Sequence, residues 1–206
     1  PSADNVPMVF HDYDLRRLTG IPGRIRGHTA AELQSMRLLG GDETIPTLAQ
    51  MLAEVAGRVP LLIEIKDPTL ASGPDVGKLP ARVAEVLAGY QGPVAVMSFN
   101  PHVIAAFHKA APDIAVGLTT CAYEAGEWPM LDAATREHLA SIADFDDVGA
   151  SFISHDRADL ENPAVTALKA RGVPVLTWTI RSHGQEVEAR RIADNITFED
   201  YLANIG

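Results

Sequence analysis

The chain has 206 residues, of which 47% are hydrophobic, and it carries a formal net charge of −10 at pH 7. This balance excludes most nucleic-acid-binding classes, because no cluster of lysine and arginine is present that could neutralise a phosphate backbone. No apolar run approaches the ~20 residues that a membrane-spanning helix needs. The single cysteine, Cys121, excludes an intrachain disulfide framework, and no cysteine–histidine spacing resembles a zinc site.

The first sixty residues predict short elements separated by turns. Residues 6–10 are typical of a short strand that ends at a His-Asp pair. Thr29 and Glu32 have the spacing of a capping box, which predicts the start of a short helix. Thr47 is placed to cap a second helix over residues 48–57, whose apolar residues fall on one side.

From residue 48 onward, predicted helices and strands alternate, which is typical of parallel βα units. The strands are expected over residues 61–66, 94–99, 114–119, 150–154, 175–180 and 196–198. The helices between them are expected over residues 80–89, 101–111, 133–143, 162–171 and 185–193. A closed (β/α)8 barrel needs eight strands, so these elements predict either a barrel with a gap or an open sheet.

The segment Leu61–Lys66 combines a short apolar run with a carboxylate at Glu64 and an ammonium at Lys66. The run is typical of a strand buried on both faces, where unpaired charges cost several kcal/mol. Side chains alternate along a strand, so residues 64 and 66 point to the same side and their charges meet. A charged pair at the C-terminal end of a parallel strand is where α/β proteins keep their chemistry. The alternative interpretation is a structural ion pair.

Short motifs spread over the whole chain allow comparison with known families. They are Val9-Phe10-His11-Asp12, the set Leu15, Arg17, Thr19 and Gly20, the pair Thr29 and Glu32-Leu33, Ile45-Pro46-Thr47-Leu48, Ile63-Glu64-Ile65-Lys66, Ser98-Phe99 and Thr177-Trp178-Thr179. In order and spacing these motifs resemble the glycerophosphodiester phosphodiesterase family.

The resemblance implies one α/β domain over residues 1–206, a (β/α)8 TIM barrel of the phosphodiesterase type. Family members open with a strand ending in His-Arg-Gly and a second strand carrying Glu-x-Asp, and neither motif occurs in this sequence. We therefore expect an N-terminally incomplete copy in which the first two strands are absent. The gap should lie between residues 196–198 and 61–66. A natural six-stranded relic would expose two sheet edges, which native proteins avoid.

The resemblance also implies roles for individual residues. His11 resembles one of the family's two catalytic histidines, and an imidazole titrates near pH ~6.5, which suits proton transfer at neutral pH. Glu64 resembles a carboxylate ligand of a divalent metal ion, either Mg²⁺ or Ca²⁺. Asp12 either orients His11 or caps the following turn. The expected substrate-binding residues are Lys66, which would contact the phosphate, Trp178, which would form an aromatic wall, Asp12 and Phe99.

The implied activity is metal-dependent hydrolysis of a glycerophosphodiester, a small-molecule substrate, to a 3-phosphoglycerol product and an alcohol by histidine acid–base catalysis. Arg181 and the segment 197–201 depart from the family pattern, which leaves the alcohol head group open. One alternative is a barrel that binds phosphodiesters without turnover. Another is a lipid-directed phosphodiesterase or lyase, for which residues 128–131 would form an exposed apolar rim, although a loop tucked onto the barrel is the favoured interpretation.

Two further expectations concern the setting of the protein. We expect a cytoplasmic location and no stable membrane insertion, while a periplasmic or secreted location stays open because the true N-terminus is expected upstream of Pro1. The sequence leaves the oligomeric state open.

Overall fold

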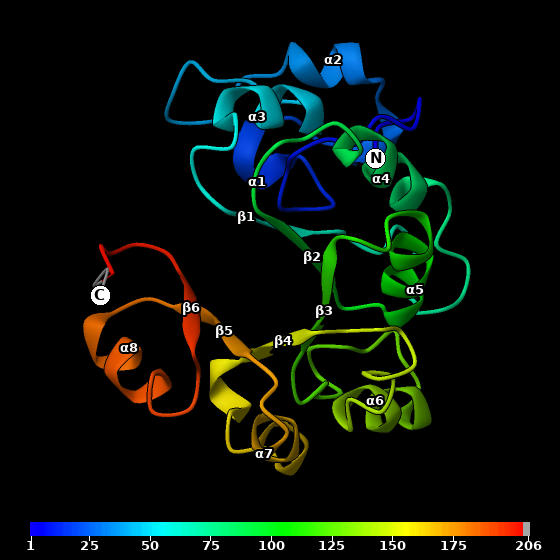
Figure 1. Ribbon diagram of the computed structural model, residues 1–206. Helices are drawn as coiled ribbons and strands as arrows, with labels where there is room; N and C mark the ends of the chain where they lie inside the picture. The colour runs from blue at the N-terminus through cyan, green and yellow to red at the C-terminus, as the bar shows by residue number, and fades with distance from the viewer. Residues whose placement is uncertain (204–206) are drawn as a thin grey trace.

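Six parallel strands form one curled sheet in the computed structural model, which describes residues 1–203. The strands are β1 (Leu61–Glu64), β2 (Val94–Ser98), β3 (Ala115–Thr120), β4 (Phe152–Asp156), β5 (Val175–Ile180) and β6 (Asn195–Phe198). They are hydrogen-bonded in chain order, and each neighbouring pair is parallel. Figure 1 shows them as an arc with β1 and β6 at its two ends. The sheet is a partial TIM barrel, and the six predicted consecutive parallel strands are confirmed.

A helix follows each of the first five strands and lies on the outer side of the arc (Figure 1). These helices are α4 (Leu79–Leu87), α5 (Pro101–Ala110), α6 (Ala133–Ala140), α7 (Pro163–Ala170) and α8 (His183–Ala189), with a short 3-10 helix, η2 (Arg157–Asp159), after β4. The helices α5 to α8 each begin at a residue whose side chain accepts a backbone N–H of the first turn; these residues are Asn100, Asp132, Asn162 and Ser182. Polar N-caps thus set where the outer helices begin.

The first part of the chain forms α1 (Arg16–Thr19), η1 (Ile25–Gly27), α2 (Ala30–Gln34) and α3 (Leu48–Val55), which lie next to the β1 end of the arc (Figure 1). Both predicted helix starts are present, since Thr29 and Thr47 each close a capping box. A small separate core holds this part together; its buried members are Leu15, Ile25, Leu33 and Ile45.

The predicted strand over residues 6–10 is wrong. Only an isolated antiparallel bridge joins Met8 to Thr47, supported by the hydrogen bonds Val9 N to Pro46 O and Leu48 N to Pro7 O. Proline has no N–H to donate, so Pro7 and Pro46 prevent this pairing from growing into a ladder. The segment consequently packs beside α3 and leads His11 toward β1.

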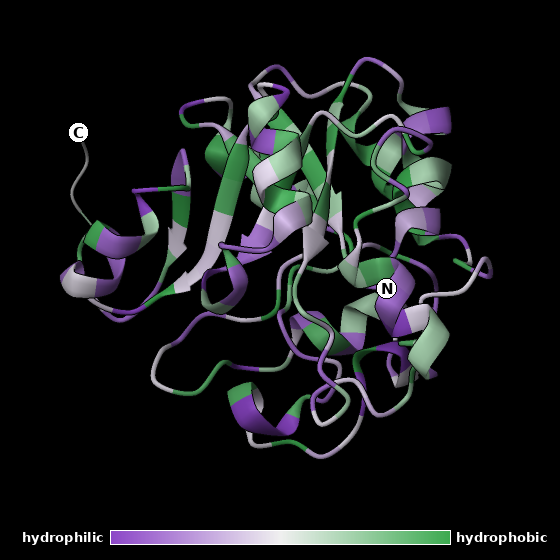
Figure 2. Cartoon of the chain, turned by 90° about the horizontal axis from the view of Figure 1, so that it is seen from below, coloured by the Kyte–Doolittle hydropathy of each residue, from purple (hydrophilic) through white to green (hydrophobic). Residues whose placement is uncertain are grey.

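The main core lies between the sheet and the outer helices, where Val96, Phe107 and Ile153 are fully buried. The strands and the helix faces turned toward them are largely apolar in Figure 2. Gly117 of β3 stands opposite Phe152 of β4, and a Cβ there would lie 2.4 Å from the Phe152 ring. Glycine is therefore required at this point for the two strands to pair.

One prediction about β1 is also wrong, because this strand is not buried on both faces. Leu62 keeps 39% of its surface exposed, whereas Ile65, just past the strand, is 2% exposed and packs in the main core. The reason is position: β1 is an end strand of the arc and has a neighbour, β2, on one side. Among residues 1–203 no helix is long and apolar enough to cross a bilayer.

Candidate active site

A cavity of about 690 Å³ lies between β1 and the N-terminal part of the chain. Its polar lining includes His11, Asp12, Glu64 and Lys66, while most other lining residues are apolar, such as Leu62. Four of the six site residues expected from the sequence thus share one cavity although they come from two distant segments. Pockets of this size suit a small-molecule ligand.

The charged pair of β1 forms as its spacing predicts. Lys66 Nζ lies 2.9 Å from Glu64 Oε1, and the two side chains keep 27% and 21% of their surfaces exposed. Glu64 Oε1 is buried and accepts no hydrogen bond of ordinary geometry, so its contact with Lys66 is an ion pair without a well-aligned donor. A carboxylate oxygen in this state retains the capacity to bind another cationic group.

His11 is oriented by its neighbour in the chain. Its Nδ1 lies 2.8 Å from Asp12 Oδ1, and Arg17 holds the same carboxylate from Nε and Nη2, both at 2.6 Å. The hydrogen bonds from Arg17 lower the pKa of Asp12 to about 2. An ionised Asp12 can only accept, so the proton of His11 sits on Nδ1 and Nε2 is left as the free nitrogen. The His11 side chain is 72% exposed.

Tyr13 is a cavity residue that the sequence analysis missed. It lines the cavity together with His11 and Glu64. Burial raises the pKa of the Tyr13 phenol, and the negative charges of Asp67 and Glu64 raise it further. The phenol therefore stays protonated and is available as a neutral hydrogen-bond donor. Its only sequence signal is its place directly after the His-Asp pair, which by itself indicates no role.

Phe99 and Trp178 belong to a different cluster. Their rings meet edge to face at 5.5 Å, and Trp128 lies 5.2 Å from Phe99 and 5.0 Å from Tyr123. Phe99 and Trp178 do not line the cavity that holds the other four expected site residues. Within residues 128–131, Leu131 is only 5% exposed and Trp128 is half-buried in this cluster, whereas Pro129 and Met130 are exposed, so the loop is only partly tucked.

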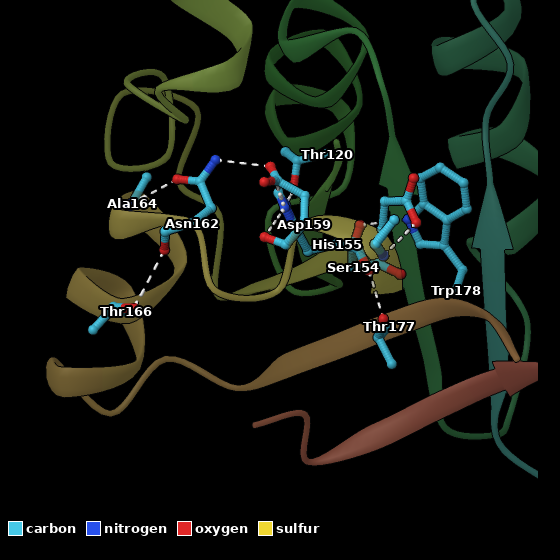
Figure 3. Close-up of polar contacts among 11 residues, drawn as sticks. Thr120, Ser154, His155, Asp159, Asn162, Ala164, Thr166, Thr177 and Trp178 are labelled. Atoms are coloured by element: carbon cyan, nitrogen blue, oxygen red, sulfur yellow. Dashed lines mark hydrogen bonds and ion pairs between the residues drawn. The ribbon is translucent and has the colours of Figure 1, made fainter. Parts of the chain in front are cut away.

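A second histidine that precedes an aspartate, His155 in β4, lies outside the cavity lining. His155 is fully buried, with Nδ1 at 2.7 Å from Thr120 Oγ1 and Nε2 at 3.2 Å from Asp159 Oδ2. Thr177 Oγ1 donates to the His155 carbonyl, and Trp178 Nε1 donates to that of Ser154 (Figure 3). Burial lowers the pKa of His155, although the Asp159 carboxylate acts in the opposite direction. The side chain ties β3, β4 and η2 together.

The same residues can be tested as a divalent-metal site. Within residues 1–203 no three histidine, cysteine, aspartate or glutamate side chains come close enough to hold an ion. Glu64 presents the buried oxygen without an aligned donor described above, whereas both oxygens of Asp12 accept hydrogen bonds. Mg²⁺ is commonly held by one or two carboxylates completed by water and substrate phosphate, so Glu64 fits as one such ligand.

Several solved structures are similar to this chain. A phosphodiesterase from Oleispira antarctica, solved in complex with the product sn-glycerol-3-phosphate, has a TM-score of 0.75 and 23% identity, with 96% of this chain and 77% of that one covered. Glycerophosphodiester phosphodiesterases from Parabacteroides distasonis and Thermotoga maritima both have a TM-score of 0.69, at 22% and 20% identity, covering 96% of this chain and 75% and 77% of theirs. At these identities the likeness shows the fold.

No curated protein sequence matches the chain significantly. The model of the glycerophosphoryl diester phosphodiesterase family, in contrast, matches residues 2–199, nearly the whole chain. The expected family is therefore confirmed. The chain belongs to the glycerophosphoryl diester phosphodiesterase family, and it is an enzyme of the phosphoric diester hydrolase class.

Proposed function

We propose that this enzyme hydrolyses a glycerophosphodiester to a 3-phosphoglycerol product and a free alcohol, with His11 moving the proton and Lys66 holding the phosphate. The proposal is supported by the cavity of about 690 Å³, whose lining includes His11, Glu64 and Lys66. The sn-glycerol-3-phosphate bound to the Oleispira antarctica phosphodiesterase supports the class of product.

Lys66 supplies positive charge for the substrate. A phosphodiester is a monoanion at neutral pH, and the Lys66 ammonium on the cavity wall attracts its non-bridging oxygens as a point charge. The partner carboxylate of Glu64, 2.9 Å from Lys66 Nζ, holds the ammonium in place before the substrate arrives. Fixed charge of this kind stabilises the additional negative charge that develops on the phosphate in the transition state.

His11 transfers a proton at the scissile ester. Its Nε2 is free because Nδ1 is bonded to Asp12, and its exposed ring can approach a bound phosphodiester. A water molecule attacks phosphorus and forms the new P–O bond, releasing its proton to solvent. As the bond between phosphorus and the leaving oxygen breaks, a protonated His11 gives the proton at Nε2 to that oxygen, which departs as the alcohol. The nearby Asp12 carboxylate stabilises the imidazolium while it is charged.

Glu64 would supply one oxygen ligand to a divalent cation, Mg²⁺ or Ca²⁺. Such an ion, when bound, would add positive charge beside the phosphate. Phe99 and Trp178 are proposed as the aromatic wall that contacts the alcohol moiety. Their edge-to-face contact, between Phe99 just after β2 and Trp178 within β5, supports an aromatic surface at this place.

The test is turnover of glycerophosphocholine by wild-type protein and by His11→Ala. Loss of a positioned acid or base lowers the chemical step by ~10²–10⁴-fold, so kcat should fall by that order while KM changes much less. His11→Gln should be no better than His11→Ala, since an amide cannot transfer a proton near pH 7. His102→Ala, on an exposed histidine of α5, is the matched control and should keep wild-type kcat.

Two outcomes would overturn the proposal. Retention of more than about a third of wild-type kcat by His11→Ala lies far above what loss of a general acid or base allows. Binding of the diester by wild-type protein without release of alcohol, with Mg²⁺ or Ca²⁺ present, would instead indicate the barrel that binds phosphodiesters without turnover.

A further inference from the structure

Lys66 lies just beyond the part of β1 that the sheet holds. The paired register of β1 and β2 ends at Glu64 and Met97, with one more backbone bond from Ile65 N to Met97 O at 2.8 Å. The carbonyl of Ile65 then accepts a hydrogen bond from Ser98 Oγ at 2.7 Å. The direction in which Lys66 leaves the strand is therefore decided by Ile65 before it and by Asp67 after it.

Asp67 is a buried carboxylate with both oxygens occupied. It is 6% exposed; Oδ1 accepts from the N–H and hydroxyl of Thr69, both at 2.8 Å. Its Oδ2 accepts from Ser72 N at 2.9 Å and from Asn100 Nδ2 at 3.2 Å. Charge-assisted hydrogen bonds in a buried position are strong, and breaking one of them leaves an unpaired charge or donor. Asp67 thus closes the turn after β1 tightly.

Asn100 connects this turn to the start of α5. It is fully buried; its Nδ2 also donates to Gly73 O at 3.0 Å, and its Oδ1 accepts from His102 N at 2.9 Å. Its own N–H donates to Ser98 Oγ, the group that holds Ile65. One continuous network of hydrogen bonds therefore fixes the backbone before Lys66, at Ile65, and after it, at Asp67.

We propose that Asp67, acting with Asn100, is a positioning residue that aims Lys66 at Glu64 and at the phosphate in the cavity. Pro68, which follows Asp67 directly, lines the cavity, and its carbonyl accepts a hydrogen bond from Arg26 Nη1 at 2.8 Å. The turn after β1 therefore holds Lys66 in place and also forms part of the cavity wall. The phosphate part of this inference rests on the proposed function, whereas the aiming of Lys66 does not.

The chain contains a matched control for this arrangement. Asn162 caps α7 as Asn100 caps α5, each is followed by proline, and Asn162 Nδ2 donates to Asp159 Oδ2 at 2.9 Å (Figure 3). Neither Asn162 nor Asp159 adjoins a charged residue of the cavity. Asn162→Ala therefore removes the same kind of cap and the same kind of amide–carboxylate bond without touching Lys66.

The experiment is a double-mutant cycle between Asp67→Asn and Lys66→Ala, read by kcat/KM for glycerophosphocholine. The amide in Asp67→Asn turns a donor toward groups that already donate, so the turn loosens and kcat/KM should fall by roughly 10–100-fold, the scale of small misplacements. In the Lys66→Ala background the same change should cost less than about 2-fold, since residues that act together are not additive. Asn162→Ala should leave kcat/KM unchanged in both backgrounds.

A second readout keeps the result independent of turnover. The methylene signal of Lys66 next to Nζ, followed by NMR, should shift in Asp67→Asn and stay at its wild-type position in Asn162→Ala. If Asp67→Asn does not fold, the same double-mutant cycle with Lys66→Ala is measured with Asn100→Ala in its place.

Two results would overturn the positioning role of Asp67. The first is that Asp67→Asn lowers kcat/KM by the same factor with and without the Lys66 side chain. The second is that the NMR signal of Lys66 does not move in Asp67→Asn. Wild-type protein without turnover would refute the proposed function instead, and the Lys66 signal would then decide the positioning alone.

Discussion

Two His-Asp dipeptides occur in this chain, and their histidines lie in opposite surroundings. His11-Asp12 lies on the cavity beside β1, whereas His155-Asp156 ends β4 and is sealed beneath η2. The His11 side chain is 72% exposed and bonded through Nδ1, while His155 is fully buried and bonded through both ring nitrogens. The pair in the sequence is the same; the partners supplied by the fold are different.

The difference lies in what each aspartate contacts. Asp12 accepts from His11 and is locked by Arg17, so one imidazole nitrogen stays free. Asp156 instead accepts from Ala158 N as the cap of η2, and His155 turns to Thr120 and Asp159. A histidine with no free nitrogen and no access to solvent can hold strands together but cannot exchange protons with a substrate. These surroundings support the proposed role of His11 in proton transfer and a structural role for His155.

After His11→Ala, the largest expected effect in the first region is that of Glu64→Gln. The substitution keeps the shape of the side chain but removes the negative charge that pairs with Lys66 and that we propose as a ligand of a divalent cation. Turnover at low metal concentration should fall by at least roughly 10²-fold and recover partly as Mg²⁺ or Ca²⁺ is raised. Thermal stability should change little. Glu85→Gln, on the exposed face of α4, is the control. Metal dependence identical to that of wild-type protein would show that Glu64 is not a ligand.

Asp12→Asn tests the support of His11 rather than His11 itself. The amide no longer stabilises an imidazolium, and the two hydrogen bonds from Arg17 are weakened. We expect kcat to fall by up to about 10²-fold, the scale of a misplaced catalytic group. Asp14→Asn, whose carboxylate caps the next turn, should behave as wild type in the same kinetic assay. Equal kcat values for the two variants would mean that His11 needs no orientation from Asp12.

Trp178→Leu examines the boundary between the two regions. The substitution removes the edge contact with Phe99 and the hydrogen bond to the Ser154 carbonyl. An aromatic contact is worth ~0.5–1.5 kcal/mol, so KM should rise by roughly 3–10-fold with kcat nearly constant. Steady-state kinetics at saturating and limiting substrate separate the two parameters. An unchanged KM would place Trp178 entirely in the structural region.

The smallest effect on turnover is expected for His155→Gln, which should act on stability instead. Burial lowers the pKa of folded His155 below the ~6.5 of an unfolded chain, so the unfolded state binds more protons between these two values. Stability should therefore fall as the pH drops below about 6.5, with a slope of at most ~1.4 kcal/mol per pH unit. Denaturant unfolding from pH 7 to 5 should show this slope in wild-type protein.

The same series on variants separates His155 from the other histidines. The slope should persist in His138→Gln, an exposed histidine paired with Asp144, and should be absent in His155→Gln. If the dependence of unfolding free energy on pH remains in His155→Gln, another group is responsible for it, and His155 does not have the lowered pKa argued above.

Local patterns predicted most of the fold, and contacts between distant segments account for what they missed. The six strands and the capping boxes at Thr29 and Thr47 rest on neighbours in sequence, and both were predictable. The supposed strand over residues 6–10 failed because Pro46, a distant residue, became its partner. The open face of β1 likewise depends on its place at the end of the arc rather than on its apolar composition.

The candidate site shows the same division. The meeting of Glu64 and Lys66 follows from the two-residue period of a strand, so their spacing was sufficient. Tyr13 and the buried turn around Asp67 were not predictable, because their roles depend on the approach of the N-terminal segment and of α5. The dipeptides alone were indistinguishable and only the family resemblance singled out His11; the different partners, Arg17 for Asp12 and Asp159 for His155, come from the fold.

The most direct test of the division between the two regions is the pH–rate profile of kcat for wild-type protein, His11→Ala and His155→Gln. We expect wild type and His155→Gln to share a profile with one limb set by an imidazole, whereas His11→Ala should lack this limb and have a kcat lower by ~10²–10⁴-fold. A limb that remains in His11→Ala, or one that disappears in His155→Gln, would contradict the assignment of proton transfer to His11.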